Sequence, residues 1–302
     1  MDGIDFKILK MLWENGREPY YKIAREVGLT GNAVRKRIQS MIEEGVIEKF
    51  DIILNLPFLG YDVIVAVLQH KSGKAKDAAF GIFAKNENVV YIADTVENKS
   101  AVVLLSRGEA GHMKCVESLL EKVKSTKLLS AFIYKQKAPM PMRMTDIDWG
   151  IIMSLKGKPR KSPQEVAREL YVSSKTVRRH LEEMIKKGVI HFGILVQPTK
   201  VKNVITYYVL LEFKEGSGAS GISKVSAQFG NTWFVHEILS PPGAIMQLYR
   251  STLKEVDDDM RSLREMDEVK SAILFIPSKL HAFSGPVSKK ISENLRKTMQ
   301  IS

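Results

Sequence analysis

The stretch AVRKRIQSMIEEGVIEKF, residues 33–50, decides the fold because the chain repeats it. Residues 176–193 read TVRRHLEEMIKKGVIHFG, displaced by a constant 143 positions. Extended outward, residues 4–47 align without a gap to residues 147–190, with 15 identities in 44 positions. Gapless identity over this length indicates duplication of one folded unit. A period of 143 residues is far too long for a solenoid repeat.

Each copy of the repeat is predicted to form three helices and a wing. In the first copy the helices are expected near residues 4–14, 19–27 and 31–44, from the spacing of apolar residues. The buried face of the third helix follows an i, i+4, i+7, i+8 pattern and consists of Val34, Ile38, Met41 and Ile42. Two short strands are expected after each third helix, in GVIEKFDIIL and in GVIHFGILVQ. These elements together describe a winged helix-turn-helix.

The third helix of a winged helix-turn-helix enters the DNA major groove. Arg and Lys can address guanine, Asn and Gln can address adenine, and many such residues hold only phosphates. Any solvent-facing helix carries Arg and Lys, but two copies in this context favour DNA contact. The candidate DNA-binding residues, including both N-caps, are Thr30, Asn32, Arg35, Lys36 and Gln39 in copy one, and Ser173, Lys175, Thr176, Arg178, Arg179 and His180 in copy two.

The segments between the helix-turn-helix units have a different pattern. Residues 61–136 alternate strand-like and helical stretches in the order βαββαβ, and residues 204–276 repeat that order with little identity. This order is typical of a ferredoxin-like split unit. The predicted fold class is therefore α+β, with two winged helix-turn-helix domains alternating with two ferredoxin-like domains.

This arrangement resembles the Lrp/AsnC family of transcriptional regulators. Copy one carries the similarity in AVRKRIQSMIEEGVIEKF followed by LPFLGY, whereas copy two has TKVKNV in place of the Leu-Gly. The resemblance implies dimers whose effector sheets pack together and present two DNA-binding heads, and one chain with two copies can supply both heads. The turns TVENKSAVV and LSPPGAIMQ lack the family's effector pattern, which argues against an amino-acid effector but leaves another small molecule possible.

Five segments follow from this division: 1–56, 57–142, 143–200, 201–276 and 277–302. The first and third are the helix-turn-helix domains, the second and fourth the ferredoxin-like domains, and the last a basic, helical tail. The first head holds 9 basic and 9 acidic residues, while the second holds 12 and 6. The second head is therefore expected to bind DNA more strongly and with more salt dependence.

The composition favours a polyanionic partner in a reducing cytoplasm. The net charge is +12, which suits double-stranded DNA. The one cysteine, Cys115, cannot form an intramolecular disulfide and is expected to pack in a helix. No run of eighteen apolar residues predicts a membrane span, and the N-terminus does not read as a secretory signal. The resemblance further implies a homodimer.

Catalytic, metal-binding and cofactor-binding motifs are not found in the sequence. The six histidines lack metal-ligand spacing, and no phosphate loop or Ser-His-Asp pattern can be read. Two alternatives stay open. The first is a sirohaem decarboxylase on the same fold, for which His236, Tyr249 and Arg250 lie on predicted adjacent strands. The second is a DNA-packaging protein of low sequence preference.

Overall fold

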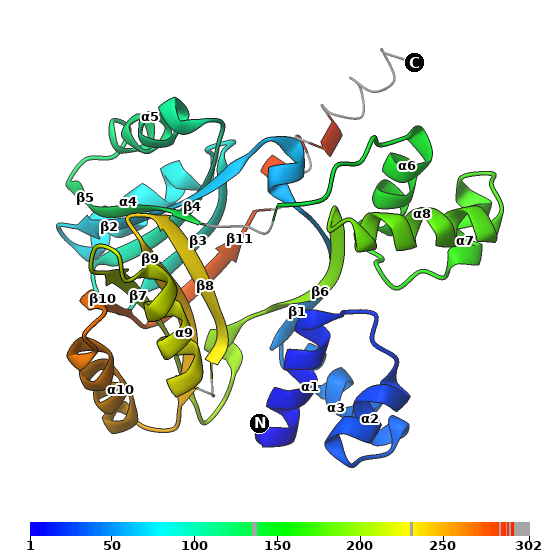
Figure 1. Ribbon diagram of the computed structural model, residues 1–302, viewed down its shortest axis with the longest axis horizontal. Helices are drawn as coiled ribbons and strands as arrows, with labels where there is room; N and C mark the ends of the chain where they lie inside the picture. The colour runs from blue at the N-terminus through cyan, green and yellow to red at the C-terminus, as the bar shows by residue number, and fades with distance from the viewer. Residues whose placement is uncertain (135–137, 230–231, 284, 288, 290, 293–302) are drawn as a thin grey trace. The chain divides into compact units, whose positions relative to one another are not determined.

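The computed structural model describes residues 1–134, 138–229, 232–283, 285–287, 289 and 291–292. The chain forms two compact units, and each unit takes segments from both copies of the repeat. The first unit comprises residues 1–59, 137–200 and 289–302, and the second comprises residues 60–136 and 201–288. Figure 1 shows the elements of both units along the chain.

The first head consists of α1 (Gly3–Glu14), α2 (Tyr20–Val27), α3 (Gly31–Glu43) and β1 (Ile47–Leu54). The second head repeats it with α6 (Asp146–Leu155), α7 (Pro163–Glu169), α8 (Ser174–Lys186) and β6 (Ile190–Val196). The predicted N-caps hold: Thr30 Oγ1 accepts from the Ala33 N–H, and Ser173 Oγ accepts from the Thr176 N–H.

The buried face of the third helix is narrower than predicted. Val34, Ile38 and Met41 are buried, but Ile42 is 38% exposed and its counterpart Ile185 is 46% exposed. Three apolar positions per two turns suffice to pack α3 on the other helices of the head. The fourth position of the pattern therefore lies at the rim of the core.

The wing differs from the prediction. Each head supplies one strand, and β1 pairs antiparallel with β6, from Ile47 opposite Val196 to Leu54 opposite Ile190. An isolated two-stranded ribbon is marginal in water, whereas this shared ribbon also packs on both heads. The two heads of one chain are thus joined to each other by the ribbon of β1 and β6 (Figure 1).

In the described residues of the second unit, the strands form one nine-stranded sheet. The first copy contributes β2 (Asp62–His70), α4 (Gly73–Phe83), β3 (Val89–Thr95), β4 (Lys99–Ser106), α5 (Glu109–Leu120) and β5 (Thr126–Tyr134). The second contributes β7 (Ile205–Phe213), α9 (Gly218–Gln228), β8 (Thr232–Ser240), β9 (Gly243–Arg250), α10 (Leu253–Glu265) and β10 (Val269–Phe275). The 3₁₀ turns Leu56–Leu59 and Pro198–Lys200 precede the two sets.

Each set of strands has the ferredoxin-like order, and the two sets are joined. The order is β10-β7-β9-β8-β5-β2-β4-β3-β11, so the end of β5 pairs with β8 of the other copy. Strand β11 (Pro277–Ala282) pairs with β3. The start of the basic tail is therefore a strand rather than the predicted helix. Residues 285–287, 289 and 291–292 are helical, and residues 293–302 lie outside the described ranges.

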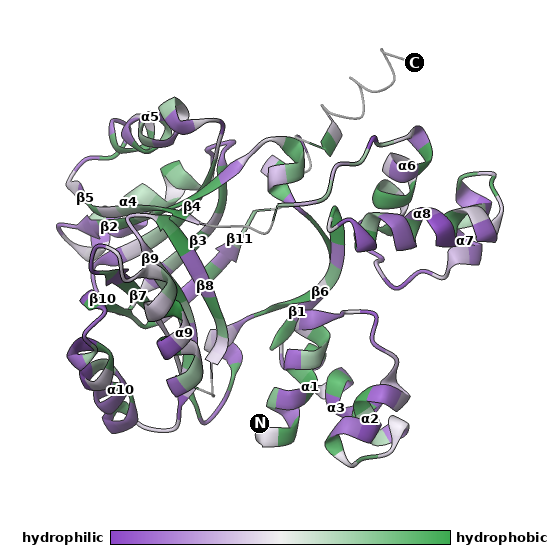
Figure 2. Cartoon of the chain, in the orientation of Figure 1, coloured by the Kyte–Doolittle hydropathy of each residue, from purple (hydrophilic) through white to green (hydrophobic). Residues whose placement is uncertain are grey.

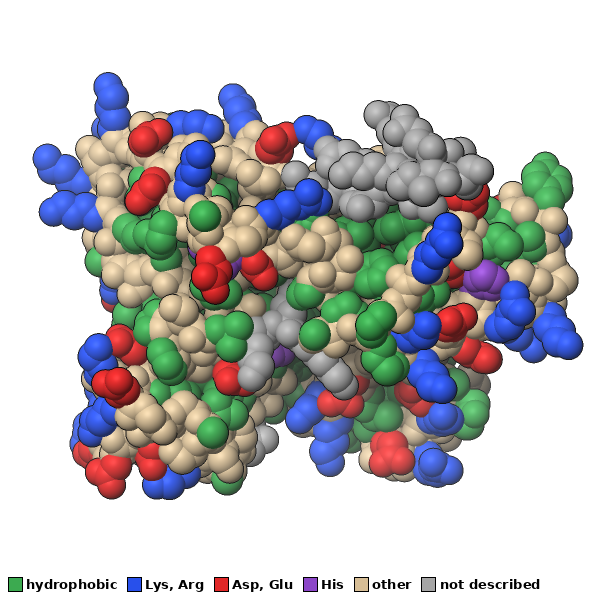
Figure 3. All heavy atoms as spheres, turned by 45° about the horizontal axis from the view of Figure 1, so that its top comes forward, with side chains coloured by type: hydrophobic (Ala, Val, Ile, Leu, Met, Phe, Trp, Pro, Cys, Tyr) green, Lys and Arg blue, Asp and Glu red, His purple; other side chains and the backbone are tan. Residues whose placement is uncertain are grey.

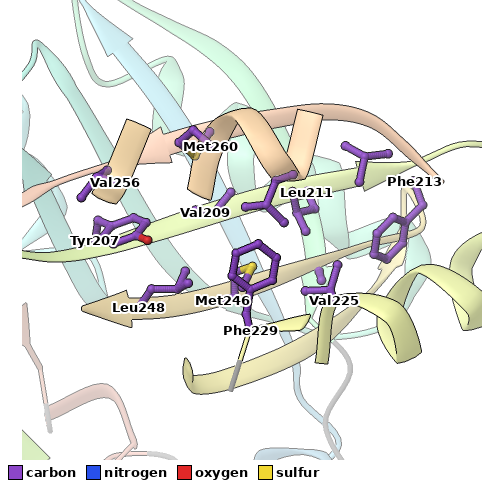
Figure 4. Close-up of a cluster of buried hydrophobic side chains, with 13 residues drawn as sticks. Tyr207, Val209, Leu211, Phe213, Val225, Phe229, Met246, Leu248, Val256 and Met260 are labelled. Carbon is purple, nitrogen blue, oxygen red and sulfur yellow. The ribbon is translucent and has the colours of Figure 1, made fainter. Parts of the chain in front are cut away.

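Helices cover one face of each half-sheet, and the other faces meet. The second half packs α9 and α10 on its strands through side chains such as Phe213, Phe229 and Met246 (Figure 4). A separate cluster joins Val67 and Phe132 of the first half to three residues of the second, namely Leu210, Ile238 and Phe275. Figure 2 shows hydrophobic strands beside helices whose outer faces are hydrophilic. The two half-sheets thus pack face to face within one chain.

Candidate nucleic-acid interface

The predicted DNA-binding residues lie at the start and along one face of α3 and α8. Asn32, Arg35, Lys36 and Gln39 are exposed on α3, opposite its buried face. In the second head, the exposed side chains are Lys175, Arg178 and Arg179. Thr30 and Ser173 are the exposed N-caps, and Thr176 is half-buried, with its hydroxyl 2.8 Å from that of Ser173. Gln39 donates to Glu43 at 2.9 Å.

The basic side chains of this face are not neutralised by carboxylates. Within the described ranges, no ion pair involves Arg35 or Lys36 in the first head, or Lys175, Arg178 or Arg179 in the second. Lys and Arg side chains gather over α7 and α8 in Figure 3. Exposed cations without a carboxylate partner are available to phosphates and base edges.

His180 has a different placement from the one predicted. Its Nδ1 lies 2.7 Å from Oδ1 of Asp148, a fully buried residue of α6, so the ring is directed into the head. Arg37, the residue aligned with His180, likewise donates to Asp5 at 2.7 Å, and Asp5 aligns with Asp148. Each head therefore braces its third helix against its first through an aspartate. This geometry corrects the assignment of His180 to the DNA-contacting set.

The brace of the first head includes a second carboxylate. Arg37 also donates to Asp2 at 2.9 Å. Hydrogen bonds from the Asp5 backbone and from Arg37 hold the pKa of Asp2 below its usual range, and the two carboxylates raise the pKa of Arg37. The second head has one aspartate and a histidine in this place, so the two braces differ in composition.

Reciprocal arginines hold the heads together, a feature that the sequence reasoning missed. Arg17 Nε donates to the Pro159 carbonyl at 2.6 Å, and its Nη2 to the Lys161 carbonyl at 3.0 Å. Arg160, displaced by 143 positions, donates through Nε to the Gly16 carbonyl at 2.9 Å. The sequence did hold one signal for this contact. Arg17 and Arg160 are identical, although the residues on either side of them differ between the two loops. Their carbonyl partners lie on the other copy, which local spacing cannot reveal.

The ribbon and the loops of the two heads approach each other closely. The Gly16 N–H donates to the Phe192 carbonyl at 2.9 Å, and a Cβ on Gly16 would lie 2.6 Å from the Gly193 carbonyl oxygen. The ribbon ends are tied by Asn55 N–H to Val189 O at 2.8 Å, with a matching bond at the opposite end. Backbone contacts therefore fix α3 and α8 relative to each other within the first unit.

The residues named for a decarboxylase do not form one site. His236 pairs across the sheet with Ile245, five positions from Arg250 on β9. Its ring packs edge-on against Tyr134, and burial lowers its pKa to about 4. Arg250 instead contacts Asp259 of α10 at 2.8 Å. Strand pairing therefore separates His236 from Tyr249 and Arg250, which lie at the far end of β9.

Neither Cys115 nor any cluster of potential metal ligands points to a chemical role in the described part of the chain. Cys115 packs against the core under α5, where burial raises the pKa of its thiol to about 11. Among the described residues, no group of three His, Cys, Asp or Glu side chains is placed to hold a metal ion. Over the same ranges, no helix is long and apolar enough to cross a membrane.

Comparison with known proteins identifies the class and then the family. A family model for winged helix-turn-helix DNA-binding units matches residues 1–48 and residues 144–191. The transcriptional regulator FL11 of Pyrococcus horikoshii is 34% identical over 104 residues, which cover 34% of this chain and 68% of that protein. FL11 of Pyrococcus furiosus is 26% identical over 47% of this chain and 97% of its own length. The chain belongs to the Lrp/AsnC family of transcriptional regulators, in a tandemly duplicated form.

A solved structure matches the whole chain in fold. The sirohaem decarboxylase NirDL, in complex with an iron-uroporphyrin III analogue, superposes with a TM-score of 0.60 over 98% of this chain and 99% of its own. The identity is 15%, so this likeness concerns the arrangement of the duplicated units alone. The two proteins thus share one architecture.

Proposed function

We propose that this chain is a transcriptional regulator that binds a specific double-stranded DNA site with α3 and α8 together. The observation that carries the proposal is the pair of exposed basic faces, free of carboxylate partners in the described ranges, on two heads joined by β1 and β6. Contacts from each head add, and the fixed pairing of the heads makes half-site spacing part of the recognition. The candidate contacts are the predicted set without His180.

The two half-sites should be read unequally. The second head has an excess of six basic residues over residues 143–200, whereas residues 1–56 are neutral. Copy one has Asn32 and Gln39 where copy two has Lys175 and Glu182, so the bases addressed differ. We therefore expect a site of two related but non-identical halves, separated by about one helical turn or a multiple of it.

Selection from randomised duplexes, followed by fluorescence anisotropy across a salt series, tests this proposal. Affinity for the selected duplex should exceed that for random DNA and fall by orders of magnitude between roughly 50 and 200 mM salt. Arg261→Ala, an exposed change on α10, is the matched control and should leave binding unchanged. Binding that ignores sequence would favour the DNA-packaging alternative, and binding to no duplex would refute the proposal.

Assembly, location and ligand are further parts of the proposal. We expect two chains to associate into a homodimer with four heads, which light scattering tests through the mass in solution. A mass of one chain at micromolar concentration would contradict it.

The cytoplasmic location expected from the sequence stays a prediction. A small-molecule effector is compatible with the fold, and the turns between the central strands argue against an amino acid.

Absence of enzymatic activity is also proposed, against the decarboxylase alternative. Family membership and the separation of His236 from Arg250 support it, while the likeness to NirDL keeps the question open to test. Absorption spectra after mixing the protein with sirohaem decide between them. We expect no bound porphyrin and no decarboxylated product. A stoichiometric porphyrin complex with turnover would establish the enzyme instead.

A further inference from the structure

A cavity of about 320 Å³ opens between the loops that join the first two helices of each head. Its walls come in pairs displaced by 143 positions, so both copies line it equally. The lining residues are Arg17, Glu18, Pro19, Tyr20, Arg160, Lys161, Ser162 and Pro163. The cavity belongs to the first unit alone and is separate from the exposed faces of α3 and α8.

Among the described residues, the two arginines of this cavity are held in place by neutral groups and not by a carboxylate. The Arg17 guanidinium lies 4.1 Å from the ring centre of Phe192, and that of Arg160 lies 4.4 Å from the ring of Phe50. Arg160 also donates to the Tyr20 hydroxyl at 2.6 Å. Each guanidinium uses two of its five N–H donors in hydrogen bonds to neutral acceptors, which leaves donors for an anion.

The other charged walls are neutralised by their own neighbours. Glu18 pairs with Lys22 at 3.5 Å, and Lys161 pairs with Glu169 at 2.7 Å. The charge that remains over the cavity is therefore that of two guanidiniums. Burial and the nearby Arg160 lower the pKa of Arg17 to about 10.

One wall of the cavity also lacks a helix cap. Helix α2 begins after Pro19, which provides no side-chain cap, whereas the aligned Ser162 caps α7 through the Glu165 N–H. The Lys22 N–H donates to the Pro19 carbonyl at 2.9 Å, so the N–H groups of Tyr20, which lines the cavity, and of Tyr21 are the ones that no side chain caps. Such N–H groups add to the attraction for an anion.

We propose that this cavity binds a phosphate group between Arg17 and Arg160. Planar guanidiniums match phosphate oxygens in pairs of hydrogen bonds, and two from different heads can clamp one tetrahedral anion. A ligand held by both heads binds their paired arrangement and stabilises it by mass action. The binding itself is independent of the proposed function, while the competition with DNA that identifies the source of the phosphate rests on it.

Titration of the full chain with inorganic phosphate, at constant ionic strength, tests the site. We expect saturable binding of one phosphate per chain, with the amide chemical shifts of residues 16–18 and 20 and of residues 160–162 changing together. Arg160→Gln should weaken binding at least tenfold, and Arg25→Gln, an exposed change on α2, should not. No saturation up to about 10 mM, well above a millimolar dissociation constant, would overturn the proposal. So would shifts confined to α3 and α8.

A second variant protects the test against misfolding. Pro19→Ser copies the cap of the second head, and it should keep or raise thermal stability while weakening phosphate binding by occupying the α2 donors. Unchanged phosphate affinity in both Arg160→Gln and Pro19→Ser, with folded protein, would refute the site. A loss in Arg160→Gln with an intact far-ultraviolet spectrum supports it.

The source of the phosphate is decided by adding the selected duplex at saturation. If the protein–DNA complex still binds free phosphate, the site serves a small phosphorylated ligand. If the duplex excludes free phosphate, the occupant is a backbone phosphate of DNA. Phosphate binding without any DNA binding would leave this inference standing and refute the proposed function, whereas DNA binding without phosphate binding would do the reverse.

Discussion

The two copies of the repeat keep the same fold with different local chemistry. The aspartate that braces the third helix is retained, but its partner is Arg37 in the first head and His180 in the second. The left-handed residue of the helix-turn-helix is Gly28 in one and Tyr171 in the other. Such pairs show which features the fold requires and which each copy is free to change.

The two copies thus share the braces and the interface, while their charge and their helix caps diverge. Arg17 and Arg160 keep equivalent positions because each serves the other head. The recognition faces differ in charge, and the proposed function assigns each of them its own half of the DNA site. Four sets of variants test this division, beginning with the largest expected effect.

Removing the bracing aspartate should damage the second head more than the first. Asp148 is 1% exposed and accepts from Thr145 as well as meeting His180, whereas the Asp5 side chain is 13% exposed. Breaking a buried pair costs about 3–5 kcal/mol, so we expect that loss for Asp148→Ala and about half of it for Asp5→Ala. Denaturant unfolding measures both, with the exposed Asp146→Ala as control. Equal losses would show that burial does not distinguish the two braces.

Removing the basic pairs should weaken DNA binding unequally. Arg178 and Arg179 lie in the basic head and Arg35 and Lys36 in the neutral one, and all four are exposed. Each lost base contact costs roughly 1–3 kcal/mol, whereas a lost phosphate contact mainly lowers the salt slope. We expect the double alanine variant of the second head to bind more weakly across a salt series. A weaker first-head variant would show that the family-like head dominates recognition. Unchanged binding in both would exclude these helices as readers of DNA.

Acid should destabilise the second half-sheet through His236. Burial lowers its pKa to about 4, while a histidine in the unfolded chain titrates near pH 6.5. The unfolded state takes up the proton first, so stability is fully present above about pH 6.5 and is lost as the pH falls toward 4. The loss between pH 7.5 and 5 should be about 2 kcal/mol.

The aligned residue of the first copy, Ala93, has no such dependence, and His236→Phe should remove it from the second. The ring change keeps an aromatic group beside Tyr134. Unfolding free energies of wild type and variant, measured at both pH values, give the difference directly. If the two proteins lose stability in parallel, another group carries the acid response.

The helices and caps could be predicted from sequence because their causes are local. Thr30 and Ser173 cap their helices through bonds that span three residues, and the buried face follows from spacing. The β1–β6 ribbon could not be predicted, because the pattern of residues within a strand does not indicate which distant strand it pairs with. His180 was misplaced for the same reason, since its partner Asp148 is brought near only by packing of α8 on α6.

The smallest expected effect concerns the turn of the second head. Tyr171 has φ 55° and is 96% exposed, while Gly28 occupies the same place with φ 69°. A residue with a side chain in the left-handed region lowers folding stability by roughly 1–2 kcal/mol, and glycine removes this strain. Glycine also raises the conformational entropy of the unfolded chain, which cancels part of the gain. Tyr171→Gly should therefore stabilise the head by about 0.5 kcal/mol, and Gly28→Ala should destabilise the other by about 1 kcal/mol.

The Tyr171→Gly variant also tests whether the strained backbone at this position contributes to DNA binding. Tyr171 lies two residues before the cap Ser173, so its exposed ring stands beside the start of α8. Strained residues persist where packing or function holds them in place. Packing against the head does not hold Tyr171, because its ring is almost wholly in solvent. We expect Tyr171→Gly to bind DNA less tightly although it is more stable, measured by anisotropy and denaturant melts on the same samples. Tighter or equal binding would leave the tyrosine as a tolerated substitution of the duplicated copy. A loss of stability would instead show that the ring packs on the head in solution.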